Sequence, residues 1–212
     1  MQNFCASYQD TVGEQYNKLD AVPEEMQTKP LAFGAQSSVG PDKLKEIQNE
    51  MAKRFKTDQA VRTDLRRQTE MQSVDVDNAA YITKLVKEFG WIDVDRFGNE
   101  ASNIAFLIVQ HSGQLPLMLA ALPEIEKDFK AEKLKDAQPY ALLYDRVKID
   151  TCQKQRYGSQ IGEEEDGTPF VFPLEDRANV DKLRKEIGMP PLAQYLLFFE
   201  MRAGKKAKFA DE

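Results

Sequence analysis

The residue whose side chain is best suited to catalysis is a histidine. His111 is the only histidine in the chain, and it follows Ile104, Leu107 and Ile108 at the i, i+3, i+4, i+7 spacing of one helix face. We therefore expect the imidazole to point into the interior, where its protonation responds readily to its surroundings. Two interpretations stay open: a general acid/base, or a structural histidine whose ring nitrogens are satisfied by hydrogen bonds.

A second candidate is the pair Asp145-Arg146, which ends an apolar helix. Burying a carboxylate and a guanidinium is costly unless each is paired. The pair is either an ion pair that fixes the helix to a neighbour, or part of a site. In the second interpretation Asp145 orients His111 as a catalytic residue, and Arg62 or Arg146 receives an anionic group.

Amide and phenol side chains supply a third set of candidates. Gln153, Gln155 and Tyr157 would fall on one face of a strand by alternation, and Gln160 closes the same segment. Gln110 directly precedes the histidine. Neutral donors and acceptors of this kind suit sugars, peptides or nucleobases, so Gln110, Gln155, Tyr157 and Gln160 are candidates for substrate binding. A solvated edge strand is the alternative.

Apolar residues at helical spacing predict the elements that position these groups. The expected fold class is mainly α: a single-domain multi-helix bundle with one small antiparallel β-hairpin near residues 153–174. It would comprise an N-terminal helix and extended arm over 1–41, a helical core over 42–203 that includes the hairpin, and a frayed tail over 204–212. Thr57-Asp58 is the expected N-cap of the second core helix. We expect core helices over 42–56, 57–72, 75–89, 103–111, 115–129, 139–150, 179–187 and 190–202.

Charge and hydropathy argue against a nucleic-acid-binding protein and against a membrane-spanning one. The net charge of −6 comes from 35 acidic and 29 basic residues that are well mixed, so no nucleic-acid partner is expected. No stretch approaches the ~18 apolar residues of a membrane span. The first residues do not form a signal peptide, so the protein is either cytoplasmic or exported with its signal already removed. Cys5 and Cys152 are either a disulfide or two free thiols.

No cofactor or metal is expected from the motifs. The chain has no Gly-rich phosphate loop and no His-Glu-x-x-His pair, and its cysteines match no metal spacing. The acidic hairpin loop, Glu163 to Asp166, is either a solvated surface or a contact for a partner protein.

Five short motifs in one order resemble a family of bacterial proteins of unknown function. They are Asp58-Gln59-x-x-Arg62, Gly90-Trp91, Gln110-His111, Asp145-Arg146-Val147 and Gln155-x-Tyr157-Gly158-Ser159-Gln160, where the family has Thr or Ser before the last Gln. The resemblance covers roughly residues 42–200. It implies that these polar landmarks belong to one shared site and that many members are exported, but it implies no activity. Cys152 stands where a small residue, often Gly, is typical.

Two functions are compatible with this inventory. In the first, a polar pocket centred on His111 binds a polar peptide- or glycan-like substrate and hydrolyses it or transfers a group. In the second, the same residues form a buried structural network in a non-catalytic protein-binding module of the immunity or adaptor type. Whether the protein is an enzyme is left open at this point.

Overall fold

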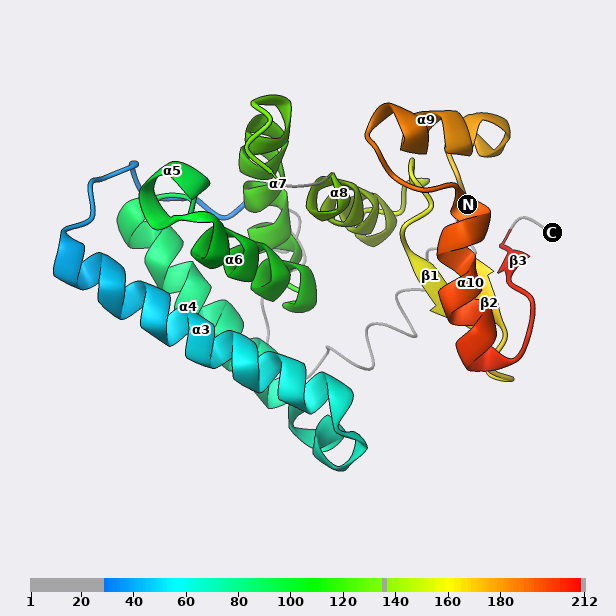
Figure 1. Ribbon diagram of the computed structural model, residues 1–212, viewed down its shortest axis with the longest axis horizontal. Coiled ribbons are helices and arrows are strands. Elements are labelled where there is room, and N and C mark those ends of the chain that lie inside the picture. Colours follow the sequence, from blue (N-terminus) through cyan, green and yellow to red (C-terminus); the bar gives the residue numbers. More distant parts are fainter. Residues whose placement is uncertain (1–28, 135–136, 211–212) are drawn as a thin grey trace. The chain divides into compact units, whose positions relative to one another are not determined.

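The described part of the chain is mainly α-helical, as the sequence predicts. This computed structural model describes residues 29–134 and 137–210. They fall into two compact units, the helical unit (29–133) and the mixed unit (134–210), and each is described by itself (Figure 1). The domain bounds expected from the sequence stay a prediction. The expected N-terminal helix and Cys5, on which the disulfide depends, lie outside the described residues.

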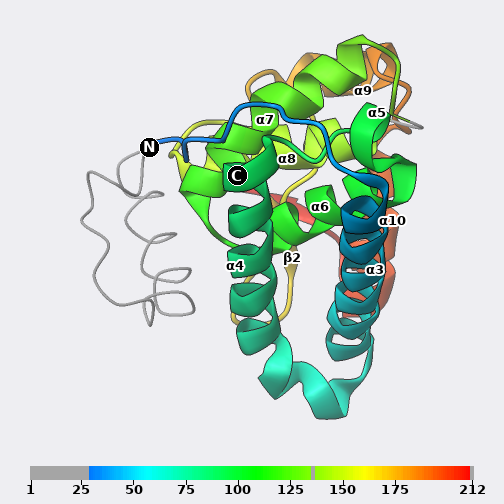
Figure 2. The ribbon, with the colours of Figure 1, turned by 90° about the vertical axis from the view of Figure 1, so that its left-hand side faces the viewer.

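The helical unit is built on two long helices that run alongside each other, α3 and α4, with α6 packed against both (Figure 2). Its elements are α3 (Pro41–Thr63), the 3₁₀ helix η1 (Leu65–Glu70), α4 (Met71–Phe89), α5 (Val94–Phe97), α6 (Asn99–His111) and α7 (Leu115–Lys130). Buried apolar residues at helical spacing hold the three helices together, because each covers the apolar faces of the other two. They include Ile47, Met51, Val61, Ala79, Ile82, Val86, Ile104, Ala105 and Ile108.

Helix α3 is longer than the sequence predicts. We expected one helix to end near residue 56 and Thr57-Asp58 to cap the next, but α3 runs without a break to Thr63, so that prediction was wrong. Thr57 Oγ1 donates to the carbonyl of Lys53 at 3.3 Å, an arrangement by which threonine fits inside a helix. Asp58 is consequently an interior helical residue, 1% exposed, and does not cap a helix.

An extended segment over residues 29–40 crosses the helical unit before α3 begins. The amide of Leu31 donates to the carbonyl of Pro116 at 2.8 Å, and the amide of Gly34 donates to the carbonyl of Val86 at 2.9 Å. This segment has no regular secondary structure, as expected for the part of the arm that is described.

Gly34 packs tightly against α4. A Cβ added at residue 34 would lie 2.1 Å from the carbonyl oxygen of Lys87. Gly34→Ala should therefore displace the segment and lower the free energy of unfolding by about 1–3 kcal/mol, measured by urea denaturation. Gly40→Ala is the matched control, because no atom lies within 4 Å of its added Cβ. An equal loss of stability in both variants would contradict the tight contact at Gly34.

The mixed unit packs short helices around a small sheet. Its helices are α8 (Gln138–Asp150), the 3₁₀ helix η2 (Arg177–Asn179), α9 (Val180–Glu186) and α10 (Leu192–Ala203). Strands β1 (Ile161–Glu163) and β2 (Pro169–Val171) pair antiparallel, with Ile161 opposite Val171. The predicted hairpin is thus confirmed, although its strands are shorter than the 155–161 and 168–174 expected.

Residues 208–209, which we expected in a frayed tail, form a third strand, β3 (Lys208–Phe209). It pairs with β2 in parallel, with Phe209 opposite Val171, and the Ala210 amide donates to the Val171 carbonyl at 3.0 Å. Phe209 accounts for the difference, because its ring packs against the core of this unit. That core consists of Val171, Leu174, Val180, Leu192 and Leu196.

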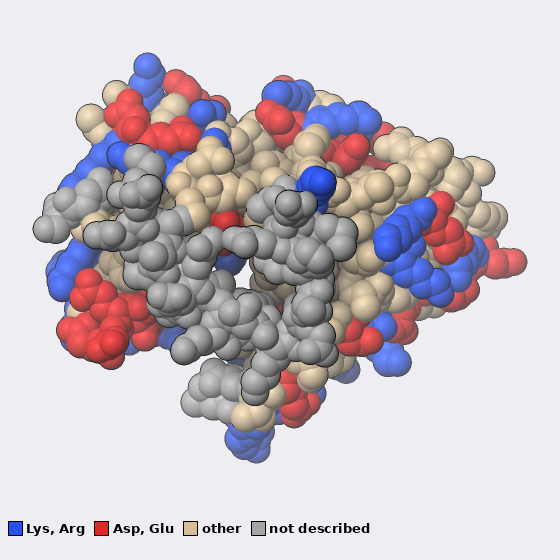
Figure 3. All heavy atoms as spheres, turned by 180° about the vertical axis from the view of Figure 1, so that it is seen from behind, with Lys and Arg blue, Asp and Glu red and all other residues tan. Residues whose placement is uncertain are grey.

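Two observations concern the surface of the described residues. None of the helices within 29–134 and 137–210 combines the length and apolar character needed to cross a bilayer. Acidic and basic side chains are interspersed over the face seen in Figure 3.

Candidate functional site

His111 forms a hydrogen-bonded pair with Asp58 in the helical unit. The histidine ends α6, and its Nδ1 lies 3.1 Å from Oδ1 of Asp58 on α3. The carboxylate side chain is 2% exposed, whereas the imidazole side chain is 23% exposed. No described residue hydrogen-bonds to Nε2. An ionised carboxylate only accepts, so Nδ1 must donate, and the neutral ring then carries its lone pair on Nε2.

Arg62 joins this pair to a second carboxylate. It lies one helical turn after Asp58 on α3, and its Nε and Nη2 lie 3.2 Å from Oδ1 of that residue. Nη2 also donates to Asp75 on α4. Gln59 Nε2 donates to the other oxygen of Asp58 at 2.9 Å. Three helices therefore bring four ionisable groups together, and we call His111, Asp58, Arg62 and Asp75 the His111 cluster.

The two carboxyls of the His111 cluster respond differently to burial. Burial alone would raise the pKa of Asp58, but the hydrogen bond and charge of His111, followed by those of Arg62, hold this pKa below its usual range. Burial raises the pKa of Asp75, and the charges of Arg62 and His111 offset it only in part. With both carboxylates ionised, two negative charges and one guanidinium leave the cluster at −1 beside a neutral imidazole. A proton on His111 brings the cluster to zero.

Asn78 adds an unused donor near the same helices. It lies three residues after Asp75 on α4, so the two share a helix face. Asn78 is 3% exposed, and its oxygen accepts from Arg54 Nη1 at 3.1 Å. Its Nδ2 has no hydrogen-bond partner among the described residues. Buried amide groups are seldom left unpaired, and this nitrogen can still donate to an acceptor.

Asp145 organises a loop of the mixed unit. It is fully buried on α8, and its carboxylate accepts from the backbone amides of Arg156, Tyr157 and Ser159 at 2.8–3.2 Å. Burial raises the pKa of this carboxyl, and the three amide donors oppose the rise. Because the chain curls around the carboxylate, residues 153–160 do not form the strand that we expected. Only Gln155 keeps a bridge, to Leu174.

The glutamines of this loop are bound to backbone groups. Gln155 is fully buried; its Nε2 donates to the carbonyls of Gln160 and Phe172 at 3.1 and 2.9 Å, and its Oε1 accepts from the Gln160 amide at 2.9 Å. Gln160 Nε2 donates to the Leu142 carbonyl at 3.1 Å. Tyr157 is 6% exposed and makes edge contacts with two other tyrosines. These contacts fix the loop and leave the amides little capacity for a ligand.

The sequence-predicted site residues therefore fall into two groups. Arg62, Gln110 and His111 belong to the helical unit, where Gln110 is buried and precedes the histidine. Asp145, Arg146, Gln155, Tyr157 and Gln160 belong to the mixed unit, where Arg146 is half-buried on α8. The pairing of His111 with Asp145 stays a prediction. Within its own unit, the carboxylate that orients His111 is Asp58.

Sequence reasoning missed the roles of Asp58, Asp75 and Asn78. Asp58 stands four residues before Arg62 inside the first shared motif, and that spacing was a usable signal once α3 was known to continue. Asp75 and Asn78 carry no such signal. No three His, Cys, Asp or Glu side chains within 29–134 and 137–210 are arranged to hold a metal ion.

Comparison with known proteins gives one match. The model of a family of unknown function, DUF6624, matches residues 45–208, which include every residue of both groups described above. No curated protein and no solved structure matches the chain.

Proposed function

Since the chain belongs to DUF6624, a family of unknown function, we propose an activity from the site geometry: His111 is a general base that activates water or a hydroxyl group against a polar peptide- or glycan-like substrate. The reaction is hydrolysis or group transfer. The observation that carries the proposal is the 3.1 Å contact between Nδ1 and the buried carboxylate of Asp58, with Nε2 left open at a partly exposed ring.

The chemistry follows from the charges around the ring. Asp58 accepts from Nδ1–H, which fixes the tautomer in which Nε2 accepts a proton. When Nε2 takes the proton of a water molecule or substrate hydroxyl, the oxygen attacks the electrophilic centre and the ring becomes an imidazolium. The net charge of the His111 cluster then moves from −1 to zero, so buried Asp58 stabilises the protonated ring. The same proton is afterwards available to the leaving group.

Two donors on the helices of the His111 cluster support a polar substrate. Arg62 uses Nε and Nη2 for the carboxylates of its cluster, and Nη1 makes no hydrogen bond to a described residue. The Nδ2 of Asn78 is a buried donor that lacks a partner among the described residues. A carbonyl, hydroxyl or anionic oxygen of the substrate would satisfy either donor. Because two carboxylates already compensate Arg62, we expect it to orient the substrate more than to attract anions from a distance.

The sole histidine makes a direct test possible. Wild type, His111→Ala and His111→Gln are incubated with a panel of polar peptides and N-acetylated glycan oligomers, and products are read by mass spectrometry. We expect product only with wild type, because neither variant has a base at this position. Glutamine can still donate to Asp58, so His111→Gln should keep the wild-type unfolding midpoint.

The opposite pattern would support a structural role. If wild type forms no product across the panel and both variants lose about 1–3 kcal/mol of stability, His111 is a buried hydrogen-bonding residue and the proposal fails. The second candidate function is a non-catalytic binding module. The observation that favours it is in the mixed unit, where the side chains of Gln155 and Gln160 are bound to backbone groups. The exposed acidic loop is also tied down, since Lys208 pairs with Glu164 and Lys205 with Asp166.

A further inference from the structure

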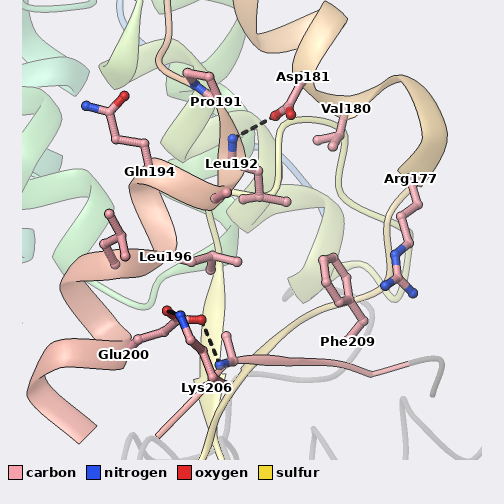
Figure 4. Close-up of a pocket in the computed structure, with 13 residues that line it drawn as sticks. Arg177, Val180, Asp181, Pro191, Leu192, Gln194, Leu196, Glu200, Lys206 and Phe209 are labelled. Carbon is pink, nitrogen blue, oxygen red and sulfur yellow. Dashed lines mark hydrogen bonds and ion pairs between the residues drawn. The ribbon is translucent and has the colours of Figure 1, made fainter. Parts of the chain in front are cut away.

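The mixed unit has a groove between α10 and the segment that leads into β3 (Figure 4). Its volume is about 690 Å³, and its floor is apolar. Leu192 and Leu196 from α10 face Val180 and Phe209 across it. These four residues also belong to the hydrophobic core of the unit or pack against it, so the floor is a rigid part of the fold. A groove of this size accommodates several side chains of a bound chain.

An exposed apolar ridge lies on α10, the helix that forms one wall of the groove. Leu197 lines the groove and is 47% exposed, while Phe198 and Met201, on the same helix, are 67% and 81% exposed. Residues 197, 198 and 201 share one face of α10. Apart from Val76 in the helical unit, they are the large apolar side chains that the described residues leave exposed. A clustered apolar surface of this kind marks an interaction site.

The acidic side chains around the groove have partners, whereas two lysines near it form no ion pair. At its rim, Glu200 pairs with Lys206 at 2.6 Å, and Asp181 accepts from the Leu192 amide at 2.7 Å. Lys182 and Lys185 line a second hollow of about 500 Å³ that shares Asp181 with the groove. Neither lysine forms an ion pair with a described residue. Both acids that line the groove are therefore engaged, and two lysines remain available for a partner.

We propose that the groove and the ridge bind a short amphipathic segment of a partner protein. Apolar side chains of that segment enter the space above Leu196 and Phe209, and its Asp or Glu residues contact Lys182 and Lys185. Recognition of this kind combines apolar anchors with flanking charges and requires no change in the fold. This interaction is independent of His111, which lies in the other unit.

Two other occupants fit the surface less well. A stable dimer buries about 800 Å² on each partner, whereas three ridge side chains supply on the order of a few hundred Å². A bilayer would contact only the exposed ridge, because a flat lipid surface does not enter a concave groove. In addition, Lys205, Lys206 and Lys208 next to the ridge are each paired with an acid. A narrow peptide chain matches both the shape and the charges.

Selection from a random 12-residue peptide display library tests the proposal with the full chain. The immobilised wild type and the variant Phe198→Glu/Met201→Glu are panned in parallel. We expect wild type alone to enrich peptides that combine apolar residues at helical or alternating spacing with Asp or Glu. Equal enrichment on both proteins, or peptides without acidic residues, would overturn the proposal. The substituted side chains are exposed, so circular dichroism should show that the variant remains folded.

The affinity of the enriched peptide, measured by fluorescence polarisation, then separates the possible occupants. Phe198→Ala, Met201→Ala and Lys185→Glu should each weaken binding by about tenfold or more, while Val76→Ala, the matched exposed apolar control in the helical unit, should have no effect. Dimerisation of the wild type that is abolished by Phe198→Ala would identify a second copy as the occupant and overturn the proposal. Ridge-dependent binding to phosphatidylglycerol vesicles, or competition by a synthetic copy of residues 1–28, would overturn it as well.

Discussion

Replacing Asp145 with Ala is expected to unfold the mixed unit under conditions where wild type is stable. The substitution removes one buried carboxylate and leaves the amides of Arg156, Tyr157 and Ser159 without their acceptor. An unpaired buried polar group costs free energy because it has lost water without gaining a partner. With three such donors, we expect the free energy of unfolding to fall by about 3–5 kcal/mol.

Hydrogen exchange locates this effect and supplies its control. The three amides should exchange much faster in Asp145→Ala, and the near-ultraviolet signal of the packed tyrosines should weaken. Glu186→Ala is the matched control, since Glu186 is an exposed acid of the same unit whose side chain forms no hydrogen bond or ion pair with a described residue. Unchanged exchange at residues 156, 157 and 159 would show that another acceptor holds the loop.

A second substitution of the same residue, Asp145→Asn, addresses the predicted pairing of Asp145 with His111. The single imidazole gives one set of nuclear magnetic resonance signals, so its environment can be followed without assignment of the whole chain. Asp145→Asn is suited to this measurement because it keeps the size of the side chain. His111 already has a carboxylate partner in its own unit, and we expect its signals to stay unchanged. A shift of these signals would instead favour the original pairing.

Much of the fold could be predicted because helical periodicity is strong along this chain. Pro41, Gly90 and Pro139 mark helix boundaries within a residue or two, since proline fits only the first turn and glycine readily adopts the positive φ seen at Gly90. The break expected at Thr57-Asp58 failed for a physical reason. A threonine hydroxyl can bond either to a capping amide or to the preceding turn, and the sequence does not decide between them.

The site was predictable only in its residue types. A solitary histidine next to an apolar helix face indicates an interior imidazole, but its partner is set by packing between helices. Asp58 and His111 are 53 residues apart in sequence. Likewise, Gln155 and Gln160 suggested ligand binding because amides are versatile, and the same versatility lets them satisfy buried backbone groups. The types of the side chains therefore identified the polar positions. They could not show which of these residues bind a ligand and which hold the fold together.

Asp58→Asn is expected to abolish general-base catalysis while leaving the helical unit folded. An asparagine amide at residue 58 can donate to Nδ1 of His111, and the ring proton then moves to Nε2, where the base is needed. Loss of the correct tautomer lowers the rate of histidine-dependent catalysis by about 10⁴-fold in the Ser-His-Asp enzymes for which it has been described. The ¹⁵N chemical shifts of the single imidazole report the tautomer directly, without a known substrate.

Asp77→Asn is the control for this measurement. It makes the same change on α4, at a side chain that is 73% exposed and paired with Arg54. The imidazole of this variant should keep the wild-type tautomer. If Asp58→Asn also keeps it, Asp58 does not orient the ring, and the general-base proposal loses its basis.

Acid stability gives an independent test of the same carboxylate. The pKa of Asp58 in the folded chain lies below its ordinary value because His111 and Arg62 favour the charged form. A depressed pKa contributes stability that is complete above the unfolded value, about 3.9, and is lost as the pH falls through the folded value. Wild type should therefore be more stable than Asp58→Asn at pH 7, and the difference should shrink below about pH 4. A stability difference that is the same at both pH values would mean that the charge of Asp58 does not stabilise the folded chain, and that an imidazolium at residue 111 would lack its counter-ion.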